Sequence, residues 1–258
     1  MNKLSLLLIL VLCWACENKY PNVTRNKIES SHNYDGHGPE GHDEEDHHHH
    51  NTDHIHVNES PVEVDFSEQD LYGSADRRLW QRPDFIIRRL GDLEGKVIAD
   101  IGAGPYGYFT FRIVSKTRVK KVIATDIDPD AVRYIDSIKT LMLPMDLQSK
   151  VETRLVQAKD SRLEFGEADV VLMVNTYTFI DDPIGYLREL HGKMAPGGKL
   201  YIIDFKKRRL SIGPEVAEKK ALYIVEQELE QAGFTNILSD DQSLEFQYIV
   251  EANRGLDN

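Results

Sequence analysis

The sequence predicts a doubly wound, Rossmann-like α/β fold of three layers over residues 67–258. Short apolar runs alternate with longer amphipathic segments between residues 84 and 232, which is the pattern of a parallel sheet with helices on both faces. A glycine-rich loop follows the first apolar run, as in nucleotide-binding α/β domains. Two further β segments, near residues 236–239 and 245–252, could pair as a C-terminal antiparallel hairpin. A mostly parallel sheet with one antiparallel hairpin is therefore expected.

The predicted elements follow one another along the chain without long gaps. Residues 84–90 are expected to form a helix, because their four large apolar side chains fall on one helical face. Strands are predicted at residues 96–101, 121–126, 151–157, 169–175 and 199–205. Further helices are predicted at residues 109–115, 129–141, 183–194 and 215–232, the last of them ended by Gly233. A Pro-Gly-Gly turn at residues 196–198 leads into the last of these strands.

This arrangement brings several polar residues to one edge of the predicted sheet. Ligands of open α/β sheets bind outside the carboxyl ends of the parallel strands. Residues 102–107, Asp126, Asp160 and Asn175 all follow or end predicted strands and so belong to that edge. The sequence predicts the ligand site there.

The glycine-rich loop, residues 102–107, suits a nucleotide cofactor. Its glycines permit a tight strand-to-helix turn and let a ligand approach the backbone without interference from Cβ atoms. Asp126 lies 19 residues after Gly107, at the end of the next strand, where its carboxylate can accept hydrogen bonds from two ribose hydroxyls. These features alone fit NAD as well as other nucleotides.

The order of motifs in the domain resembles class I S-adenosylmethionine (SAM)-dependent methyltransferases. In that family an acid precedes the glycine loop, as Asp100 does here, and SAM carries an ammonium group that an acid can meet. The likeness covers about residues 81–252 and is closest to the small-molecule branch, which includes quinone-biosynthesis methyltransferases. Six segments carry it: residues 97–104, 124–129, 157–161, 169–172, 195–200 and 232–234.

The resemblance implies a set of cofactor-binding residues. Asp100 would face the methionine amino group, Asp126 would hold the ribose hydroxyls, and Asp160 would accept from the adenine amino group. The glycines would pass beneath the methionine and ribose, Ile127 would pack on adenine, and Asn175 would lie near the methyl group. The full set is Asp100, Gly102, Ala103, Gly104, Gly107, Asp126, Ile127, Asp160, Ser161 and Asn175.

The last glycine of the loop departs from the family pattern. The usual spacing is Gly-x-Gly-x-Gly, whereas Pro105 and Tyr106 place Gly107 one residue further along. Plainer roles also stay open for the other residues. Asp126 and Asp128 could cap the helix that begins at residue 129, and Asp160 could be a surface turn residue.

The first 15 residues are predicted to be a signal peptide of the lipoprotein type. Residues 4–12 form an apolar run too short to span a bilayer, which needs about 20 residues. Ala15 stands directly before Cys16, which is the arrangement of bacterial lipoprotein signals, although Cys13 occupies a position where an aliphatic residue is usual. Cys16 is the predicted lipidation site, and a plain secretory signal or membrane-anchoring N-terminus is the alternative.

Residues 16–66 are predicted to be a disordered acidic tether, since they show neither a helical nor a strand period. They hold most of the net charge of -12, with twelve acidic residues against three basic ones. Nine of the ten histidines lie between residues 32 and 56, and imidazoles beside carboxylates suit Zn²⁺, Ni²⁺ or Cu²⁺. A solvated spacer is the alternative to weak metal binding. The candidate ligands are His47, His48, His49, His50, His54 and His56.

The sequence therefore favours a SAM-dependent methyltransferase acting on a small-molecule acceptor that it does not identify. No clustered basic surface is evident, and the short basic run at residues 116–121 is expected to be a solvated loop or helix end, so nucleic acid is not an expected partner. The expected location is the bacterial cell envelope, with membrane contact through the lipid anchor only, or the cytoplasm if the signal does not function. The alternatives are a lipid-anchored, non-catalytic SAM- or metal-binding protein and an NAD-dependent oxidoreductase.

No catalytic base can be assigned from the sequence. Tyr106, Tyr177 and Asp181 are candidates because they lie on loops at the ligand edge. His191, the only histidine of the domain, falls within a predicted helix, where a structural role is expected.

Overall fold

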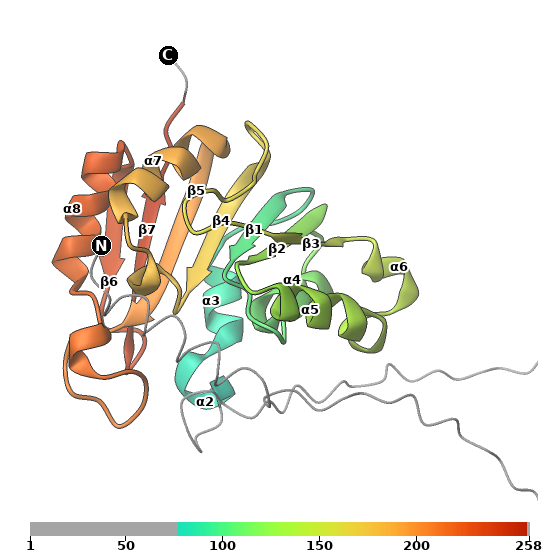
Figure 1. Cartoon of the computed structure of the whole chain (residues 1–258), viewed down its shortest axis with the longest axis horizontal. Helices are drawn as coiled ribbons and strands as arrows, with labels where there is room; N and C mark the ends of the chain where they lie inside the picture. Colours follow the sequence, from blue (N-terminus) through green and yellow to red (C-terminus); the bar gives the residue numbers. More distant parts are fainter. Residues whose placement is uncertain (1–76, 257–258) are drawn as a thin grey trace, which may run out of the picture. The chain divides into compact units, whose positions relative to one another are not determined.

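A computed structural model of the chain describes residues 77–256. They contain a seven-stranded sheet in the order β3-β2-β1-β4-β5-β7-β6 (Figure 1). The first five strands in this order are parallel, whereas β7 is antiparallel to both β5 and β6. The bounds are β1 Val97–Ile101, β2 Lys121–Asp126, β3 Val151–Leu155, β4 Ala168–Val174, β5 Met194–Phe205, β6 Thr235–Asp240 and β7 Gln247–Asn253. The predicted fold class and its antiparallel hairpin are confirmed.

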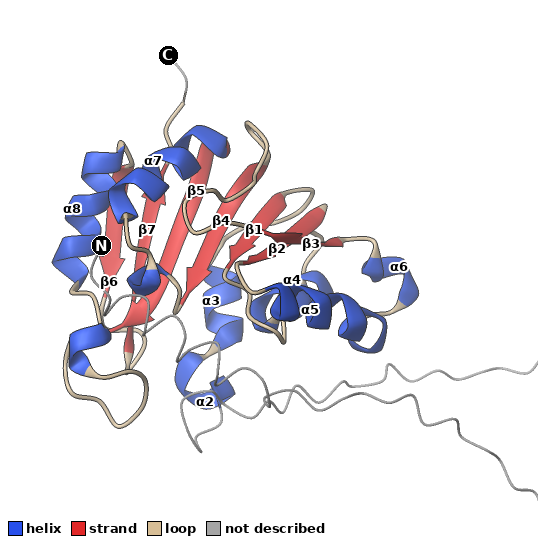
Figure 2. Ribbon diagram, in the orientation of Figure 1, coloured by secondary structure: helices blue, strands red, loops and turns tan. Residues whose placement is uncertain are grey.

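Helices cover both faces of this sheet (Figure 2). Alternate residues of the central strands divide into two buried clusters: one contains side chains of α3, α4 and α5, the other those of α7 and α8. Strands that are buried on both faces read as continuous apolar runs, which explains the strength of the β4 signal. The helices are α2 Arg77–Gln81, α3 Pro83–Arg89, α4 Tyr108–Lys116, α5 Pro129–Met142, α6 Met145–Gln148, α7 Pro183–Lys193 and α8 Leu222–Ala232.

The helix predicted at residues 215–232 is wrong as one continuous element. It is divided into a short 3-10 helix, η2 (Val216–Glu218), and α8, with Lys219 and Ala221 in extended conformation between them. Glu215 and Glu218 form a reciprocal capping box that closes the short helix, and buried Lys219 turns inward to donate to the Arg208 carbonyl. The helical periodicity is local to each piece, and tertiary contacts separate the two.

Three smaller differences concern the edges of elements. The strand predicted at residues 151–157 ends at Leu155, because Gln157 and Asp160 pair with each other in a tight turn. The turn predicted at residues 196–198 lies within β5 as an irregularity, since Ala168 pairs with Met194 but Val170 pairs with Lys199. The short helices α2, α6 and η1 (Tyr177–Phe179) were not predicted.

The carboxyl ends of β1, β2, β4 and β5 meet at one edge of the sheet, and α2 lies beside that edge in Figure 1. Trp80 of α2 is buried against Phe205, the last residue of β5, with ring centroids 5.6 Å apart. The edge that the sequence assigns to ligand binding is thus flanked by a helix from the N-terminal side of the domain.

Candidate functional site

The glycine loop lies between the end of β1 and the start of α4. The backbone N–H groups of Gly102 and Ala103 donate to the Thr125 carbonyl at 2.8 and 3.0 Å, which folds the loop against β2. Gly102 has φ +72, and a Cβ there would lie 2.5 Å from the Thr176 side chain. Gly104 has φ +67, but a Cβ there would meet nothing within 4 Å. One glycine is required by packing, whereas the other faces open space where a ligand can approach.

Asp126 ends β2 beside this loop. Its carboxylate accepts hydrogen bonds from the backbone N–H groups of Gly104 at 2.9 Å and Asp128 at 3.0 Å. Burial raises the pKa of Asp126, while these two bonds oppose the rise. A carboxylate offers about four acceptor sites, so about two remain for the hydroxyls of a ribose. Asp128 itself is the N-cap of α5, accepting from the Asp130 N–H at 2.8 Å.

Asp100 is a buried carboxylate in β1 with only 3% of its surface exposed. It accepts a hydrogen bond from the Thr110 hydroxyl at 2.7 Å, and burial raises its pKa to about 6. The positive charge of Arg77 on α2 opposes this rise in the pKa of Asp100, and the charge of Asp126 adds to it. A buried acid that lacks an ion-pair partner among the described residues suits a cationic group of a ligand.

Asp160 and Ser161 lie in and directly after the tight turn that follows β3. Asp160 is exposed, accepts from the Arg162 N–H at 2.8 Å, and lines a cavity with Arg154, Arg162 and Lys193. This is the turn role that the sequence left open for it. The Ser161 hydroxyl is buried and donates to Glu189 of α7 at 3.1 Å. The contact of both residues with adenine therefore stays a prediction.

Asn175, directly after β4, has φ +56 and is held by a chain of amides. Its Oδ1 accepts from Gln247 Nε2 at 2.6 Å, and Gln247 Oε1 accepts from Gln81 Nε2 at 3.2 Å. Gln81 in turn accepts from the Arg77 guanidinium. Asn175 Nδ2 is buried and has no hydrogen-bond partner in the described part of the chain. This amide therefore presents a donor at the sheet edge.

Three of these residues, Arg77, Gln81 and Gln247, were not found by the sequence analysis. Their signal is weak: Gln81 follows Trp80 in a largely charged segment, and Gln247 is a polar residue beside Tyr248 at the start of an apolar stretch. Only the antiparallel placement of β7 beside β5 brings Gln247 to the end of β4. The site thus includes an N-terminal helix and a C-terminal strand.

The candidate bases differ in burial and in the groups they contact. Tyr177 is fully buried and donates to Glu228 at 2.7 Å, and burial together with Glu228 raises its pKa, so it is a poor base. Tyr106 packs edge-on against Tyr134, and Asp181 is exposed. His191 lies at the end of α7, packed edge-on against Phe234, which fits the expected structural role.

The predicted metal and lipid sites fall on residues outside those that the structure describes. These are Cys16 and the six histidines between residues 47 and 56. Within residues 77–256 no group of histidine, cysteine or acidic side chains could hold a metal ion. The same residues contain no helix that is long and apolar enough to cross a membrane.

The strand order of this sheet differs from that of the dinucleotide-binding domains. Those domains continue their parallel sheet in the order 3-2-1-4-5-6, whereas here antiparallel β7 is inserted between β5 and β6. Residues 99–200 match the family described as a methyltransferase domain. The match of residues 99–200 supports a methyltransferase domain, and the fold is shared with solved SAM-dependent methyltransferases.

Similar proteins carry methyltransferase names. A tRNA U34 carboxymethyltransferase from Desulfotalea psychrophila is 31% identical over 125 residues, which is 48% of this chain and 36% of that protein. The chain thus matches only about a third of the length of this relative. A SAM-dependent methyltransferase from Aquifex aeolicus has a TM-score of 0.61 at 24% identity, covering 70% of this chain and 93% of its own.

A further solved structure with this fold contains the cofactor. Phosphoethanolamine N-methyltransferase 2 from Haemonchus contortus, in complex with S-adenosyl-L-methionine, has a TM-score of 0.56 at 15% identity. The likeness covers 68% of this chain and 53% of that protein. At such identity it shows the shared fold alone.

Proposed function

We propose that the domain binds SAM at the carboxyl edge of β1 and β2 and transfers its methyl group to a small-molecule acceptor. The observation that carries the proposal is the pair of acids, Asp100 and Asp126, on either side of a glycine loop whose Gly104 faces open space. Asp100 would meet the ammonium group of SAM, and Asp126 would accept from the ribose hydroxyls. Ile127 is 63% exposed beside Asp126, which suits packing against adenine.

Methyl transfer from a sulfonium is an in-line displacement, in which the acceptor atom forms a bond to carbon as the carbon–sulfur bond breaks. Positioning and exclusion of water can supply most of the rate increase, so a general base is not required when the acceptor is already a nucleophile. Asn175 Nδ2 offers a fixed donor that could orient an acceptor oxygen, because Gln247 holds the other end of the amide. We assign no base.

Calorimetric titration with SAM tests the cofactor part of the proposal. Wild-type protein should bind, and Asp126→Ala should weaken binding by about tenfold or more, since hydrogen bonds to a charged group contribute about 1.5–3 kcal/mol. Asp146→Ala is the matched control, because Asp146 is exposed on α6. Unchanged affinity in Asp126→Ala would remove this residue from the site, and binding of NAD without SAM would favour an oxidoreductase.

A screen with methyl-labelled SAM then tests transfer. Label passing to small-molecule acceptors supports an enzyme. SAM binding without transfer to any acceptor would favour the non-catalytic binding protein instead.

We also propose that the chain is anchored to a bacterial membrane through lipid on Cys16. The support is the apolar run of residues 4–12 and the placement of Ala15 before Cys16. Metabolic labelling with radioactive palmitate should mark the wild type and not Cys16→Ser. An unlabelled wild type would overturn the lipid anchor, leaving a plain secretory signal or a location in the cytosol, where SAM is made.

A further inference from the structure

The loop that follows β5 begins with a cluster of positive charge. Residues 206–209 read Lys-Lys-Arg-Arg, directly beyond Phe205 at the carboxyl edge of the sheet. A cavity of about 320 Å³ opens there, lined by Lys206, Lys207 and Arg208 together with Tyr248. Asp241 is the one carboxylate in its lining. The volume is near the lower limit for small-ligand pockets, so it suits one polar group rather than a whole nucleotide.

The cations of this cavity are held in place by neutral groups. Lys206 Nζ donates to the carbonyls of Leu244 at 2.7 Å and Glu245 at 3.1 Å, and Arg208 donates to the Glu245 carbonyl at 3.2 Å. Lys207 Nζ donates to the Lys219 carbonyl at 2.7 Å. None of the three forms an ion pair with a carboxylate within residues 77–256. Asp241 accepts instead from Gln242 Nε2 at 2.5 Å.

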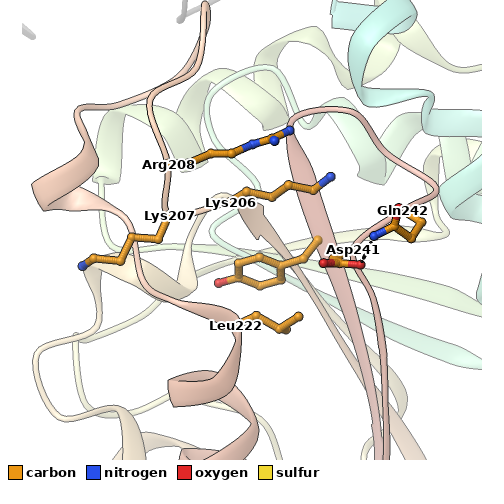
Figure 3. Close-up of a pocket in the computed structure, with 7 residues that line it drawn as sticks. Lys206, Lys207, Arg208, Leu222, Asp241 and Gln242 are labelled. Carbon is orange, nitrogen blue, oxygen red and sulfur yellow. Dashed lines mark hydrogen bonds between the residues drawn. The ribbon is translucent and has the colours of Figure 1, made fainter.

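Lys206 and Arg208 extend in the same direction, whereas Lys207 points the opposite way (Figure 3). Burial lowers the pKa of Lys206, and repulsion by the neighbouring charge of Arg208 lowers it further. The negative charges of Asp241, Asp240 and Glu245 partly offset this lowering. Fixed cations without a charged partner are arranged to receive an anion, which would relieve the repulsion.

The cavity lies within reach of the proposed methyl position. The Asn175 N–H donates to the Ile203 carbonyl of β5 at 2.9 Å, and Lys206 follows three residues later. Adjacent strands are about 4.8 Å apart and rise about 3.3 Å per residue, which puts the start of the loop about 10 Å from Asn175. A small metabolite spans this distance. A second cavity, also lined by Lys207, extends to Thr178 in η1.

We propose that Lys206 and Arg208 bind an anionic group, a carboxylate or a phosphate, carried by the methyl acceptor. The proposal rests on the proposed function for its acceptor, but the anion site itself can be tested without SAM. The proposal assigns small acidic molecules as the substrate class. The sequence alone did not identify the acceptor. The proposal also gives the β5–α8 loop a role in acceptor specificity.

The test is titration of the full chain with acetate and with inorganic phosphate, followed by backbone NMR. Saturable shifts are expected at residues 205–208 and 241–245, and the tighter anion identifies carboxylate or phosphate as the class. Lys206→Gln with Arg208→Gln should weaken binding about tenfold or more, as loss of charge-assisted bonds predicts. Arg209→Gln is the matched control, because Arg209 is exposed in the same loop and does not line the cavity.

Other outcomes separate this proposal from its competitors. Absence of saturable shifts, or equal affinity in the double variant and the control, would overturn it. If the double variant unfolds the loop because Lys206 no longer donates to the Leu244 and Glu245 carbonyls, Arg208→Gln alone is used as the test variant. A tRNA preparation is the third probe: binding that falls in Arg208→Gln, while acetate and phosphate do not bind, would assign the loop to nucleic acid. Failure of SAM to bind the wild type would contradict the proposed function and leave a measured anion site unaffected.

Discussion

At the scale of single residues, Asp126 and Asp100 differ in the hydrogen-bond donors that surround their carboxylates. Asp126 accepts from two backbone N–H groups, whereas buried Asp100 accepts from one hydroxyl and the backbone around Thr110. Burial without a full set of donors raises the pKa of Asp100 to about 6. The ammonium group of a bound SAM would supply the missing positive charge.

SAM affinity should therefore depend on pH through Asp100. As pH falls through about 6, the carboxylate of the free protein takes up a proton and its attraction for the ammonium is lost. Affinity should fall about tenfold for each pH unit below this value, which calorimetry between pH 5 and pH 8 can measure. Asp100→Asn should bind weakly throughout and show little change over this range. If SAM affinity depended equally steeply on pH in Asp100→Asn, another titrating group would be responsible for the pH dependence.

Two of the glycines at which a Cβ would meet open space offer a matched pair for locating the cofactor. Gly95 and Gly104 have φ +70 and +67, and a Cβ at either would meet nothing within 4 Å. Alanine at each position should lower the stability by a similar amount, about 1 kcal/mol, through backbone strain. Only Gly104→Ala should weaken SAM binding, since Gly95 precedes β1 at the opposite edge. Equal affinities for SAM in the two variants would contradict a cofactor site beside Gly104.

At the scale of elements, the chain Gln81–Gln247–Asn175 joins α2, β7 and the end of β4. It explains how a five-residue helix, too short to be stable alone, is held at the sheet edge. The stacking of Trp80 on Phe205 adds apolar contact to the same attachment. Sequence periodicity predicts the long helices well but gives no signal for such a short one.

Gln247→Leu should loosen this attachment. It leaves the amides of Gln81 and Asn175 partly unpaired in buried surroundings, at an expected cost of about 1–3 kcal/mol in unfolding free energy. Urea unfolding measures the cost, and hydrogen exchange at residues 77–82 should become faster. In the double variant with Gln81→Leu the cost should be less than the sum of the single costs. Strict additivity would mean that the two amides do not interact.

At the scale of the whole molecule, buried and paired acids act on stability in opposite directions. Burial raises the pKa of Asp100 and of Asp204 to about 6, whereas Arg154 lowers the pKa of Glu167 to about 2. The first two destabilise the fold as they ionise between about pH 4 and 6. The stabilisation from Glu167 is complete above about pH 4.5, where the carboxyl of the unfolded chain is ionised, and it is lost as pH falls to about 2.

These effects predict a maximum of stability near pH 4 rather than at neutral pH. Unfolding free energy should fall as pH rises from about 4 to 6, because the folded state then releases protons that the unfolded chain has already lost. It should also fall below about pH 4 as the Glu167 pairing is lost. Urea unfolding of the full chain at pH 2 to 8 measures the profile, with Glu167→Gln expected to flatten its acid side. A maximum of the unfolding free energy at pH 7 or above would contradict the raised pKa values of Asp100 and Asp204.

The sequence alone determined the fold class, the order of most elements and the position of the glycine loop between β1 and α4. These depend on local signals: apolar periodicity, glycine spacing, and caps such as Asp128 and Gly233. Asp126 at the end of β2 was predictable for the same reason. A local pattern reports on the conformation of its own segment.

Only the tertiary structure decided which distant side chains complete the site. Gln247 reaches Asn175 because antiparallel β7 is inserted beside β5, and Lys206 and Arg208 are oriented by carbonyls of the β6–β7 turn. Ser161 is turned toward α7 by Glu189, which no motif indicates. These contacts join residues 28 to 166 positions apart. Such pairings arise from the packing of whole elements, so no window of sequence contains them.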